Sequence, residues 1–575
     1  MLEPSISRRA AAVDERRIMA GTGFGKNDGP ASKSGAKPLV RPLLLAAAGG
    51  GLQTLAWPWP GWWPLCFVAL LPLIAAAAGQ SGRRALACGW VYGLVQSLTS
   101  LPWLADVLAG YGGLGFRLGW LVLFLLAAYL AIYPALFAWL ITLRVPGPPW
   151  CWSLAGAGAW AGLDWLKNWV FTGFNWTPLA GPLALSPELG QAADVFGFYG
   201  LGFFAALINL WLASAFFLGR DRGPGAGRPY VLAALGLLAL GFAYGRLGHE
   251  HWEAAADRAL NRRVTVIQPA LDQAEKWEPL DRDRHLALYS GLVREAGRTS
   301  PWLLLWPETA LPFFYGADQA ETAWLDALVS EVGGLNLVGV SALEGDWPGQ
   351  PLHNRMLLFR DGRPGPWYDK RHLVPFGEYL PLDWLPFLSL DFLGGVVGAA
   401  GTYDPGRPQP PLDLTLGPDQ ARQVRLGLMI CFESTFPHLG RERVLAGADL
   451  LVVPTNDGWF GRSRAPGQHL LQAAMRAVET RRPLVRAGNT GISAVIRPSG
   501  RISQATELMA RGVFTLETPI LAPADTEETV FLRWGHGLAP ALAVWTGLMA
   551  GLRFWTGEKR RGSGGVRFRL KKARK

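Results

Sequence analysis

The sequence predicts a chain of two parts, a set of membrane-spanning helices and an α/β domain. Hydrophobic residues make up 50% of its 575 residues and charged residues only 17%, which is too apolar for an ordinary water-soluble protein of this length. The 27 tryptophans agree, because indole rings favour the membrane–water interface. Between residues 248 and 532 the charge rises, and short strand-like runs alternate with helix-like stretches. This alternation is typical of layered α/β domains.

Eight apolar stretches are long enough to span a bilayer. They lie at about 40–57, 62–79, 85–104, 117–143, 150–169, 196–218, 229–247 and 535–555. Seven precede the α/β segment and one follows it. The sequence therefore predicts a disordered tail at 1–39, a seven-helix membrane domain at 40–247, an α/β domain at 248–532, a last membrane helix at 533–556 and a basic tail at 557–575.

The basic residues indicate which side of the membrane each loop faces. Lys and Arg gather in both tails and in every second loop, at Arg83, Arg84, Arg144, Arg220, Arg222 and Arg228. Cytoplasmic loops are enriched in these residues, so we expect both termini in the cytoplasm and the α/β domain on the outer side. The net charge of +11 then serves orientation and contact with anionic lipid, and we expect no nucleic-acid partner.

The α/β segment contains recognisable strands and helices. Strands are expected within 262–271, 301–309, 336–343, 355–362, 424–431 and 448–461, paired strands with glycine turns over 484–502, and helices at 280–297, 322–332 and 467–483. Three of these strands end in polar residues, namely Glu308, Cys431 and the pair Asn456-Asp457. The ends of buried strands are where α/β domains usually place their chemistry.

Cys431 has two readings when it is considered by itself. The chain has four scattered cysteines without a CxxC pair, which predicts neither a disulfide framework nor a metal site. A lone cysteine at a strand end is commonly a small buried side chain. A nucleophilic thiol needs a base or a positive charge nearby, and His372, His438 and His469 form no known Cys-His pattern with it.

Glu308 and Lys370 offer an alternative base and positive charge. Glu308 follows an apolar strand, where partial desolvation raises the pKa of a carboxylate toward the range of a general base. Lys370 could stabilise an oxyanion and favour the thiolate, and Glu378 could hold this lysine or share the role of base. Each residue by itself also fits an ordinary loop glutamate or surface lysine.

The motifs around these residues decide between the readings. WPET (306–309), DKRHLVPFGEYLP (369–381), CFES (431–434) and PTNDGWFG (454–461) together resemble the nitrilase superfamily over roughly 260–520. This resemblance implies an α-β-β-α sandwich with a Glu308–Lys370–Cys431 triad. A domain of this kind before the last of eight membrane helices resembles the apolipoprotein N-acyltransferase family over about 40–555. Two departures are Arg371 between Lys370 and His372, and Phe432 where many members have Tyr.

The resemblance implies a reaction, its substrates and a location. Cys431 would take the sn-1 acyl chain of a phospholipid, typically phosphatidylethanolamine, as a thioester. The α-amine of a diacylglyceryl-cysteine on an apolipoprotein would then receive it. The enzyme would lie in the bacterial inner membrane with its catalytic domain in the periplasm. No cofactor or metal is implied, and nothing demands more than a monomer.

The remaining site residues divide into supporting and substrate-binding groups. Glu378, Glu433 and Phe432 would support the triad, and Trp277, Asn456, Trp459 and Phe460 would contact substrate. The aromatic-rich segments 173–182 and 383–395 are candidates for substrate-facing or membrane-dipping elements. Two alternatives are a membrane-tethered amidase that uses the same triad and a transporter or scaffold with an inert outer domain.

Overall fold

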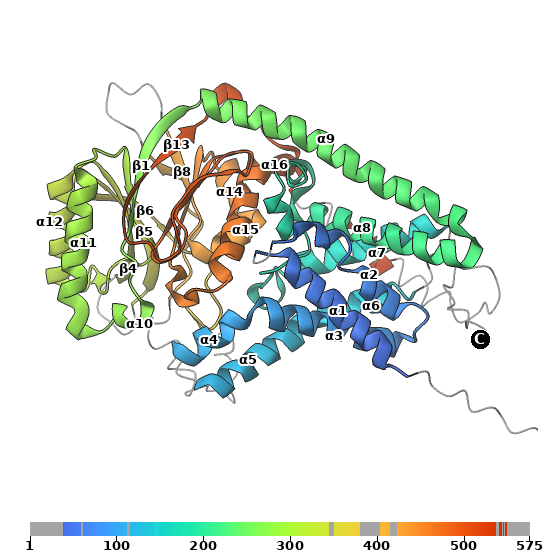
Figure 1. The fold of residues 1–575 in the computed structure, drawn as a ribbon. Coiled ribbons are helices and arrows are strands. Elements are labelled where there is room, and N and C mark those ends of the chain that lie inside the picture. The colour runs from blue at the N-terminus through green and yellow to red at the C-terminus, as the bar shows by residue number, and fades with distance from the viewer. Residues whose placement is uncertain are drawn as a thin grey trace, which may run out of the picture. The chain divides into compact units, whose positions relative to one another are not determined.

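The computed structural model describes residues 38–548 with gaps at 59–60, 112–114, 144, 146–147, 344–349, 380–402, 415–422, 536, 538–539, 543 and 546. The described chain forms a group of helices from residues 40–258, followed by two β-sheets with helices on their outer faces (Figure 1). The two basic tails and segment 383–395 lie outside the described residues, as does most of the last expected span.

The N-terminal helices occupy the region where seven spans are expected. They are α1 (Val40–Ala56), η1 (Trp63–Phe67), α2 (Leu71–Ala77), α3 (Gly82–Ser100), α4 (Pro102–Gly110), α5 (Gly115–Leu130), α6 (Ile132–Leu140), α7 (Pro149–Leu166), η2 (Val170–Thr172), η3 (Gly181–Leu185), α8 (Ala193–Arg222), η4 (Pro224–Gly227) and α9 (Arg228–Arg258). Among the described residues, three helical stretches are long and apolar enough to cross a membrane: 115–140, 193–222 and 224–258. The remaining five spans stay a prediction.

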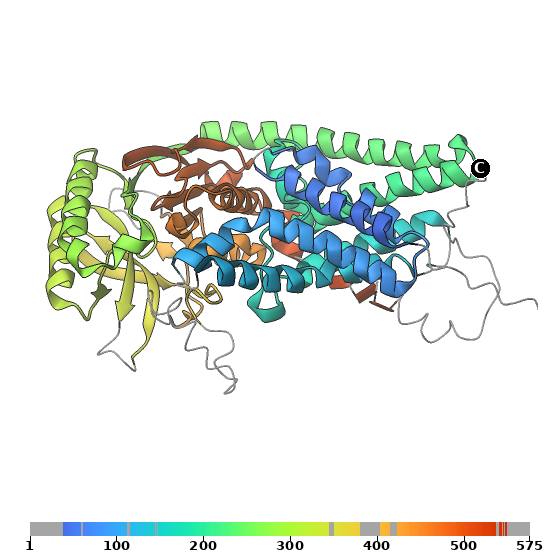
Figure 2. The same cartoon turned by 60° about the horizontal axis from the view of Figure 1, so that its bottom comes forward.

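Helix α9 extends beyond the boundary expected from its sequence. The apolar stretch ends near residue 247, but α9 continues to Arg258, and β1 begins at Leu260. In Figure 2, α9 runs beside the other N-terminal helices and reaches the sheets. A polar continuation of this apolar helix therefore leads directly into the first strand of the α/β domain.

The first sheet has the strand order β13-β1-β2-β4-β5-β6, with β3 paired to β4. Its strands are β1 (Leu260–Gln268), β2 (Leu303–Leu305), β3 (Phe314–Tyr315), β4 (Leu335–Leu343), β5 (Leu352–Arg360), β6 (Arg363–Asp369) and β13 (Gly512–Ile520). Strands β1, β2 and β4 are parallel, whereas β13 pairs antiparallel with β1 from Leu260↔Ile520 to Gln268↔Gly512. Strand β13 therefore forms the edge of this sheet, next to β1.

The second sheet has the order β12-β11-β10-β9-β8-β7. Its strands are β7 (Leu412–Asp413), β8 (Arg425–Leu428), β9 (Leu450–Thr455), β10 (Leu484–Gly488), β11 (Ala494–Ile496) and β12 (Ile502–Ala505). The central strands β8, β9 and β10 are parallel. The antiparallel pair β10–β11 confirms the paired strands predicted over 484–502.

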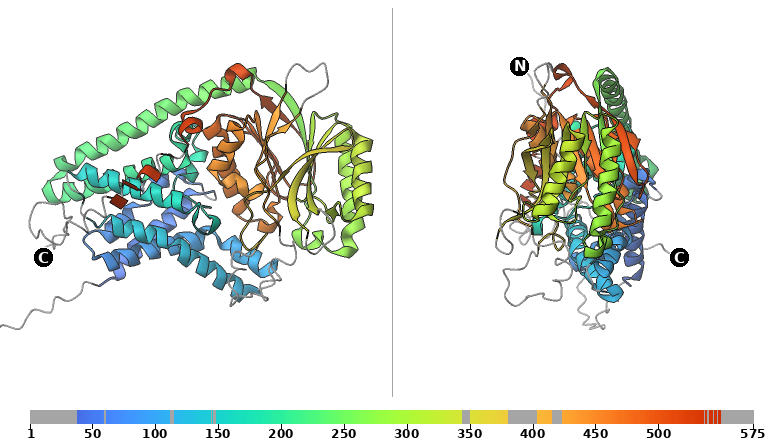
Figure 3. Two further views of the ribbon diagram at one scale, coloured as in Figure 1. Left: turned by 180° about the vertical axis from the view of Figure 1, so that it is seen from behind. Right: turned by 90° about the vertical axis from the view of Figure 1, so that its left-hand side faces the viewer.

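The two sheets pack face to face and helices cover their outer faces, as Figures 1 and 3 show. Alternate residues of one strand enter different layers: Leu450 and Val452 of β9 lie between the sheets, and Leu451 and Val453 face the helices. Strands buried on both faces explain the continuous apolar runs in the sequence. This arrangement confirms the predicted α-β-β-α sandwich.

The covering helices differ between the two sheets. Among the described residues, the helices of this domain are α10 (Gln273–Lys276), η5 (Pro279–Asp281), α11 (Arg282–Gly297), α12 (Gln319–Val332), η6 (Cys431–Thr435), α14 (Pro437–Leu445), η7 (Asp457–Phe460), α15 (Ala465–Thr480), η8 (Pro523–Asp525) and α16 (Val530–Trp534). Helices α11 and α12 cover the first sheet, and α14 and α15 cover the second. Helix α15 also contacts α8, so it lies between the second sheet and the N-terminal helices.

Arg481 joins α15 to the N-terminal helices. It is fully buried at the C-terminal end of α15, with a left-handed backbone (φ 50°) that turns its side chain out of the helix. Its guanidinium donates to Asp194 of α8 at 2.6 Å and to Gln191 at 2.6 Å, and it lies 5.4 Å from the Trp252 ring of α9. One side chain therefore connects the end of α15 to two helices that precede it by more than 200 residues.

We expect Arg481→Met to destabilise the protein, because it leaves Asp194 largely buried without its cation. Removing one partner of a buried ion pair costs about 3–5 kcal/mol, which thermal unfolding in detergent would detect as a clear fall in Tm. Arg220→Met is the control, since its pair with Asp221 is about one-third exposed and such pairs contribute at most about 1 kcal/mol. Equal Tm values for both variants would contradict this role of Arg481.

Candidate active site

The three residues of the predicted triad lie at the ends of strands from both sheets. Glu308 follows β2 and Lys370 follows β6 in the first sheet, whereas Cys431 follows β8 in the second. All three side chains are buried, with exposed fractions of 5%, 1% and 8%. Because the sheets pack face to face, segments separated by more than a hundred residues meet at one place.

Lys370 lies between two carboxylates. Its Nζ donates to Oε1 of Glu308 and to Oε1 of Glu378, each at 2.9 Å. The Nδ2 group of Asn354 bridges the same two oxygens, at 2.8 Å and 2.9 Å. Burial lowers the pKa of Lys370, but the two carboxylates outweigh this effect and raise it well above its usual value. The ammonium therefore stays charged inside the protein.

The sequence analysis predicts a raised pKa for Glu308, and the structure corrects this prediction. Burial does raise the pKa of Glu308, but the Lys370 ammonium opposes it, and hydrogen bonds from Asn354 and Cys431 add to the opposing effect. The net result is a lowered pKa. The prediction was wrong because desolvation can be read from an apolar strand, whereas a buried cation from another strand cannot. Glu308 is ionised at neutral pH and can accept a proton.

Cys431 rests as a thiol beside this carboxylate. Burial and the charge of Glu308 raise the pKa of Cys431 far above its usual value, and Lys370 lowers it only in part. The Glu308 carboxylate lies close enough to the Cys431 thiol for the two groups to interact. The Cys431 backbone has a φ of 51° where β8 turns into η6, which is strained for a residue other than glycine. The thiol must lose its proton to react, and Glu308 is in contact to take it.

Glu433 holds the nucleophile segment against the segment that follows Lys370. Its buried carboxylate accepts hydrogen bonds from the backbone N–H groups of Ile430, Arg371 and His372 at 2.7–3.0 Å, and from the Tyr368 hydroxyl at 3.0 Å. Burial raises its pKa, and these N–H donors oppose the shift. It is a positioning group, because these bonds tie the Cys431 turn to the end of β6.

Of the expected substrate contacts, Asn456 lies in direct contact with the triad. Its backbone N–H donates to Oε2 of Glu308 at 2.8 Å, and its side chain donates to Gln273 at 2.7 Å. Asn456 therefore fixes the second oxygen of the carboxylate that receives the thiol proton. Its expected contact with substrate stays a prediction.

The expected aromatic residues lie farther out. Trp459 packs on Tyr111 and Phe460 on Trp103, both from the N-terminal helices. Phe432 stacks near Phe174 and Trp176, and Trp277 packs against Phe314. Phe432, Trp459 and Phe460 thus form part of the contact between the catalytic domain and the N-terminal helices.

Comparison with known proteins shows which family the chain belongs to. Residues 49–211 match the family described as the apolipoprotein N-acyltransferase N-terminal domain, and residues 263–520 match carbon-nitrogen hydrolase. A Geobacter metallireducens protein named apolipoprotein N-acyltransferase is 35% identical, over 89% of this chain and 95% of its own. The chain belongs to the apolipoprotein N-acyltransferase family.

Two further matches are a family relative and a solved structure. A Pseudomonas syringae apolipoprotein N-acyltransferase is 31% identical, over 85% of this chain and 92% of its own. The solved structure of an amidase from Nesterenkonia sp. aligns with a TM-score of 0.34 at 21% identity, over 46% of this chain and 92% of that one. The family relatives therefore span both parts of the chain.

Several residues of the site in this family member could not be identified from its sequence. Asn354 and Thr455 lie on apolar strands, and neither the apolar pattern nor the motif that contains Thr455 shows which groups they contact. His469 and Arg486 lie on an amphipathic helix and an apolar strand. Their partners come from other elements, so their contacts depend on tertiary structure.

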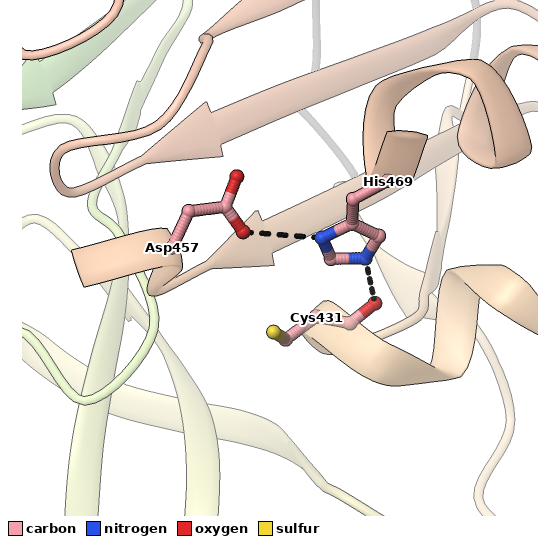
Figure 4. A group of neighbouring side chains, drawn as sticks. All are labelled: Cys431, Asp457 and His469. Carbon is pink, nitrogen blue, oxygen red and sulfur yellow. Dashed lines mark hydrogen bonds and ion pairs between the residues drawn. The ribbon is translucent and has the colours of Figure 1, made fainter. Parts of the chain in front are cut away.

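Cys431, Asp457 and His469 form a compact group (Figure 4), with one potential metal-ligand atom each within 4.8 Å of the others. The His469 ring contacts Asp457 through Nδ1 at 3.1 Å and the Cys431 carbonyl oxygen through Nε2 at 2.9 Å, while the sulfur points away from the ring. Arg486 donates to Asp457 at 2.6 Å. Arg486 thus already pairs with the Asp457 carboxylate, which a metal ion at this place would need as a ligand. His469 contacts the backbone of Cys431.

The segment 173–182 is an expected substrate-facing element that packs inside the protein. Trp176 is buried, and its Nε1 donates to Gln468 of α15 at 2.8 Å. The ring lies 5.3 Å from His469. This segment therefore links the N-terminal helices to the helix that supports Cys431. A contact with substrate stays a prediction.

We expect Lys276 to make stability depend on pH. It is buried, and its Nζ donates to the carbonyl and hydroxyl of Thr309, the residue after Glu308. Burial lowers the pKa of Lys276 from 10.5 to about 7, against the opposing charge of Glu308. Because the folded protein binds this proton more weakly than the unfolded chain does, the folded state loses stability as pH falls from 10.5 to about 7 and loses no more below.

Lys276→Met removes this titration. The stability of the wild type minus that of the variant should decrease by at least about 1.4 kcal/mol, one pKa unit, as pH falls through this window. Thermal unfolding in detergent at a series of pH values measures it. A difference that stays constant from pH 7 to 10 would contradict the assignment.

Proposed function

We propose that this chain is an N-acyltransferase that acylates the α-amine of the diacylglyceryl-cysteine of apolipoproteins. The observation that carries the proposal is the contact of the Cys431 thiol with an ionised Glu308 beside the Lys370 ammonium. Family membership over nearly the whole chain supports the acceptor. Glu308, Lys370 and Cys431 are the proposed catalytic residues.

The first half-reaction moves an acyl chain from a phospholipid to sulfur. Glu308 takes the proton of the Cys431 thiol, and the sulfur attacks the carbonyl carbon of the sn-1 ester. The ester C–O bond breaks, and the departing lysophospholipid oxygen receives the proton from Glu308. A thioester on Cys431 remains, and phosphatidylethanolamine is the proposed donor.

The second half-reaction moves the acyl chain to nitrogen. The neutral α-amine of the acceptor attacks the thioester carbon and gives a proton to Glu308. The C–S bond breaks, and the sulfur then recovers the proton. One carboxylate thus serves both half-reactions as base and acid, which requires it to stay in contact with the sulfur.

Lys370 is suited to stabilise the oxyanion of both tetrahedral intermediates. An ammonium has three N–H donors, and in the described structure two of them go to Glu308 and Glu378. The third can donate to the developing oxygen anion, together with backbone N–H groups near Cys431. Its fixed position means that little reorganisation is needed during the reaction.

The membrane location follows from the substrates. Both substrates are held in a bilayer by their acyl chains, so the sulfur must lie close to a membrane surface. The contacts of Phe432, Trp459 and Phe460 with the N-terminal helices support this placement. We propose a monomer of eight membrane helices in the inner membrane, with both termini cytoplasmic and the catalytic domain in the periplasm.

An amidase that uses the same triad is not favoured. The full-length relatives named apolipoprotein N-acyltransferase cover the N-terminal helices as well as the catalytic domain. Helix α15 and the segment around Trp176 also pack these helices against the site. An inert scaffold is not favoured either, since the triad residues are in contact.

We expect Cys431→Ala to abolish transfer of palmitate from phospholipid to a diacylated lipoprotein peptide, because the acyl carrier is removed. The assay follows the triacylated peptide by mass spectrometry, with the full chain in detergent and phospholipid. Cys151→Ala, at a free and partly exposed cysteine of α7, is the matched control and should retain activity. Full transfer by Cys431→Ala would refute the thioester mechanism.

We expect Glu308→Gln to slow formation of the acyl-thioester by about 100-fold or more, because the amide cannot accept the thiol proton. Intact-protein mass spectrometry after mixing with phospholipid detects the added acyl group. Glu295→Gln, on the exposed face of α11, is the control. A Glu308→Gln protein that forms the thioester at the wild-type rate would exclude Glu308 as the base.

A further inference from the structure

Thr455 places one hydroxyl between the nucleophile and a second carboxylate. It is the last residue of β9 and is fully buried. Its Oγ1 lies 3.1 Å from the sulfur of Cys431 and 2.9 Å from Oδ1 of Asp457. It therefore contacts the reacting atom from the second sheet, whereas Glu308 reaches the thiol from the first.

The hydroxyl has one hydrogen and two possible acceptors. While Cys431 is a thiol, its sulfur is a weak acceptor, and the carboxylate of Asp457 takes the hydrogen bond. When the sulfur becomes negative, it accepts a charge-assisted hydrogen bond, which is roughly twice as strong as a neutral one. The charge state of the sulfur thus determines which acceptor the hydroxyl serves.

Asp457 can release the hydroxyl at little cost. Its Oδ2 accepts from Arg486 at 2.6 Å, and its Oδ1 contacts His469 at 3.1 Å. The charge of Arg486 outweighs burial and holds the pKa of Asp457 well below its usual range. The carboxylate therefore stays ionised and hydrogen-bonded when the Thr455 hydroxyl turns away.

We propose that Thr455 is a further catalytic residue, whose hydroxyl turns from Asp457 to the Cys431 sulfur whenever that sulfur carries negative charge. This occurs as the sulfur attacks the donor ester and again as the C–S bond breaks in the second half-reaction. No proton leaves Thr455, since Glu308 carries the transferred proton in both steps. The inference rests on the proposed role of Cys431 as the acyl carrier.

The alternative is that Thr455 only fills space at the strand end. Valine has the same shape without the hydroxyl, and serine has the hydroxyl without the methyl group. Thr455→Val and Thr455→Ser therefore separate the two roles. Thr265→Val is the matched control, because Thr265 is also a fully buried strand threonine, with its hydroxyl bonded to Thr515 at 3.0 Å.

The first readout is the reactivity of the thiol in the full-length protein in detergent. The rate of Cys431 alkylation by iodoacetamide is measured against pH on the peptide that contains this residue. The charged or titratable groups near the sulfur are Glu308, Lys370, Asp457 and His469, and Arg486 pairs with Asp457. All are retained. Because the pKa of Cys431 is raised far above its usual value, the rate rises with pH over the accessible range. We expect Thr455→Val to lower this rate at each pH, and Thr455→Ser and Thr265→Val to leave it unchanged.

The second readout is the rate of each half-reaction in a single turnover. Loss of a hydrogen bond to a charged group corresponds to about a 10- to 100-fold effect. We expect Thr455→Val to slow both thioester formation from phospholipid and thioester consumption by a diacylated peptide to this extent. Thr455→Ser should recover most of the rate.

Two results would overturn the inference. One is a Thr455→Val protein with wild-type alkylation and wild-type half-reactions. The other is a Thr455→Ser protein as slow as Thr455→Val, which would assign the effect to packing. Failure of the proposed function is distinct, because the wild type itself would then form no acyl-thioester whatever Thr455 does to the alkylation profile.

Discussion

The site depends on one constraint, the burial of the Lys370 ammonium. A cation without water needs carboxylates and further hydrogen bonds, and these come from separate elements: Glu308 after β2, Glu378 after Lys370, and Asn354 on β5. The group assembles only when the strands of the first sheet are in register. It also sets the protonation of the site, because the ammonium keeps Glu308 ionised while burial keeps Cys431 a thiol.

The second sheet contributes the nucleophile and the groups that hold it. Glu433 ties the turn at Cys431 to the end of β6, and His469 supports the Cys431 carbonyl oxygen. The sulfur therefore lies between two carboxylates with different surroundings. Glu308 faces an ammonium and is suited to exchange protons with the thiol. Asp457 is paired with a guanidinium and has a hydroxyl group between itself and the sulfur.

Helix α15 connects this chemistry to the N-terminal helices. Its inner face packs on the second sheet and carries His469, and its end carries Arg481, which binds Asp194 of α8. Helix α8 is interrupted at Gly197 (φ 67°), and the freed N–H of Phe198 donates to Glu479 of α15 at 2.8 Å. Such buried polar contacts fix the orientation of the two parts more strictly than apolar packing would. The nucleophile is thereby held at a defined place relative to helices that can cross a membrane.

Most strands and helices of the α/β domain, and the triad itself, were predictable from the sequence. Runs such as 301–309 and 448–461 are apolar throughout because their strands are buried on both faces, and the motifs around Glu308, Lys370 and Cys431 identify the family. Asn354, Thr455 and Arg481 could not be assigned, because each is a polar residue whose partners lie on other elements. The lowered pKa of Glu308 could not be predicted for the same reason, because the cation that lowers it, Lys370, follows β6. The sequence by itself determined where the buried strands run and which chemistry the residues in the motifs at their ends can perform. Only the tertiary structure decided their charge states and hydrogen bonds, because electrostatic interactions depend on distances between segments that no local pattern encodes.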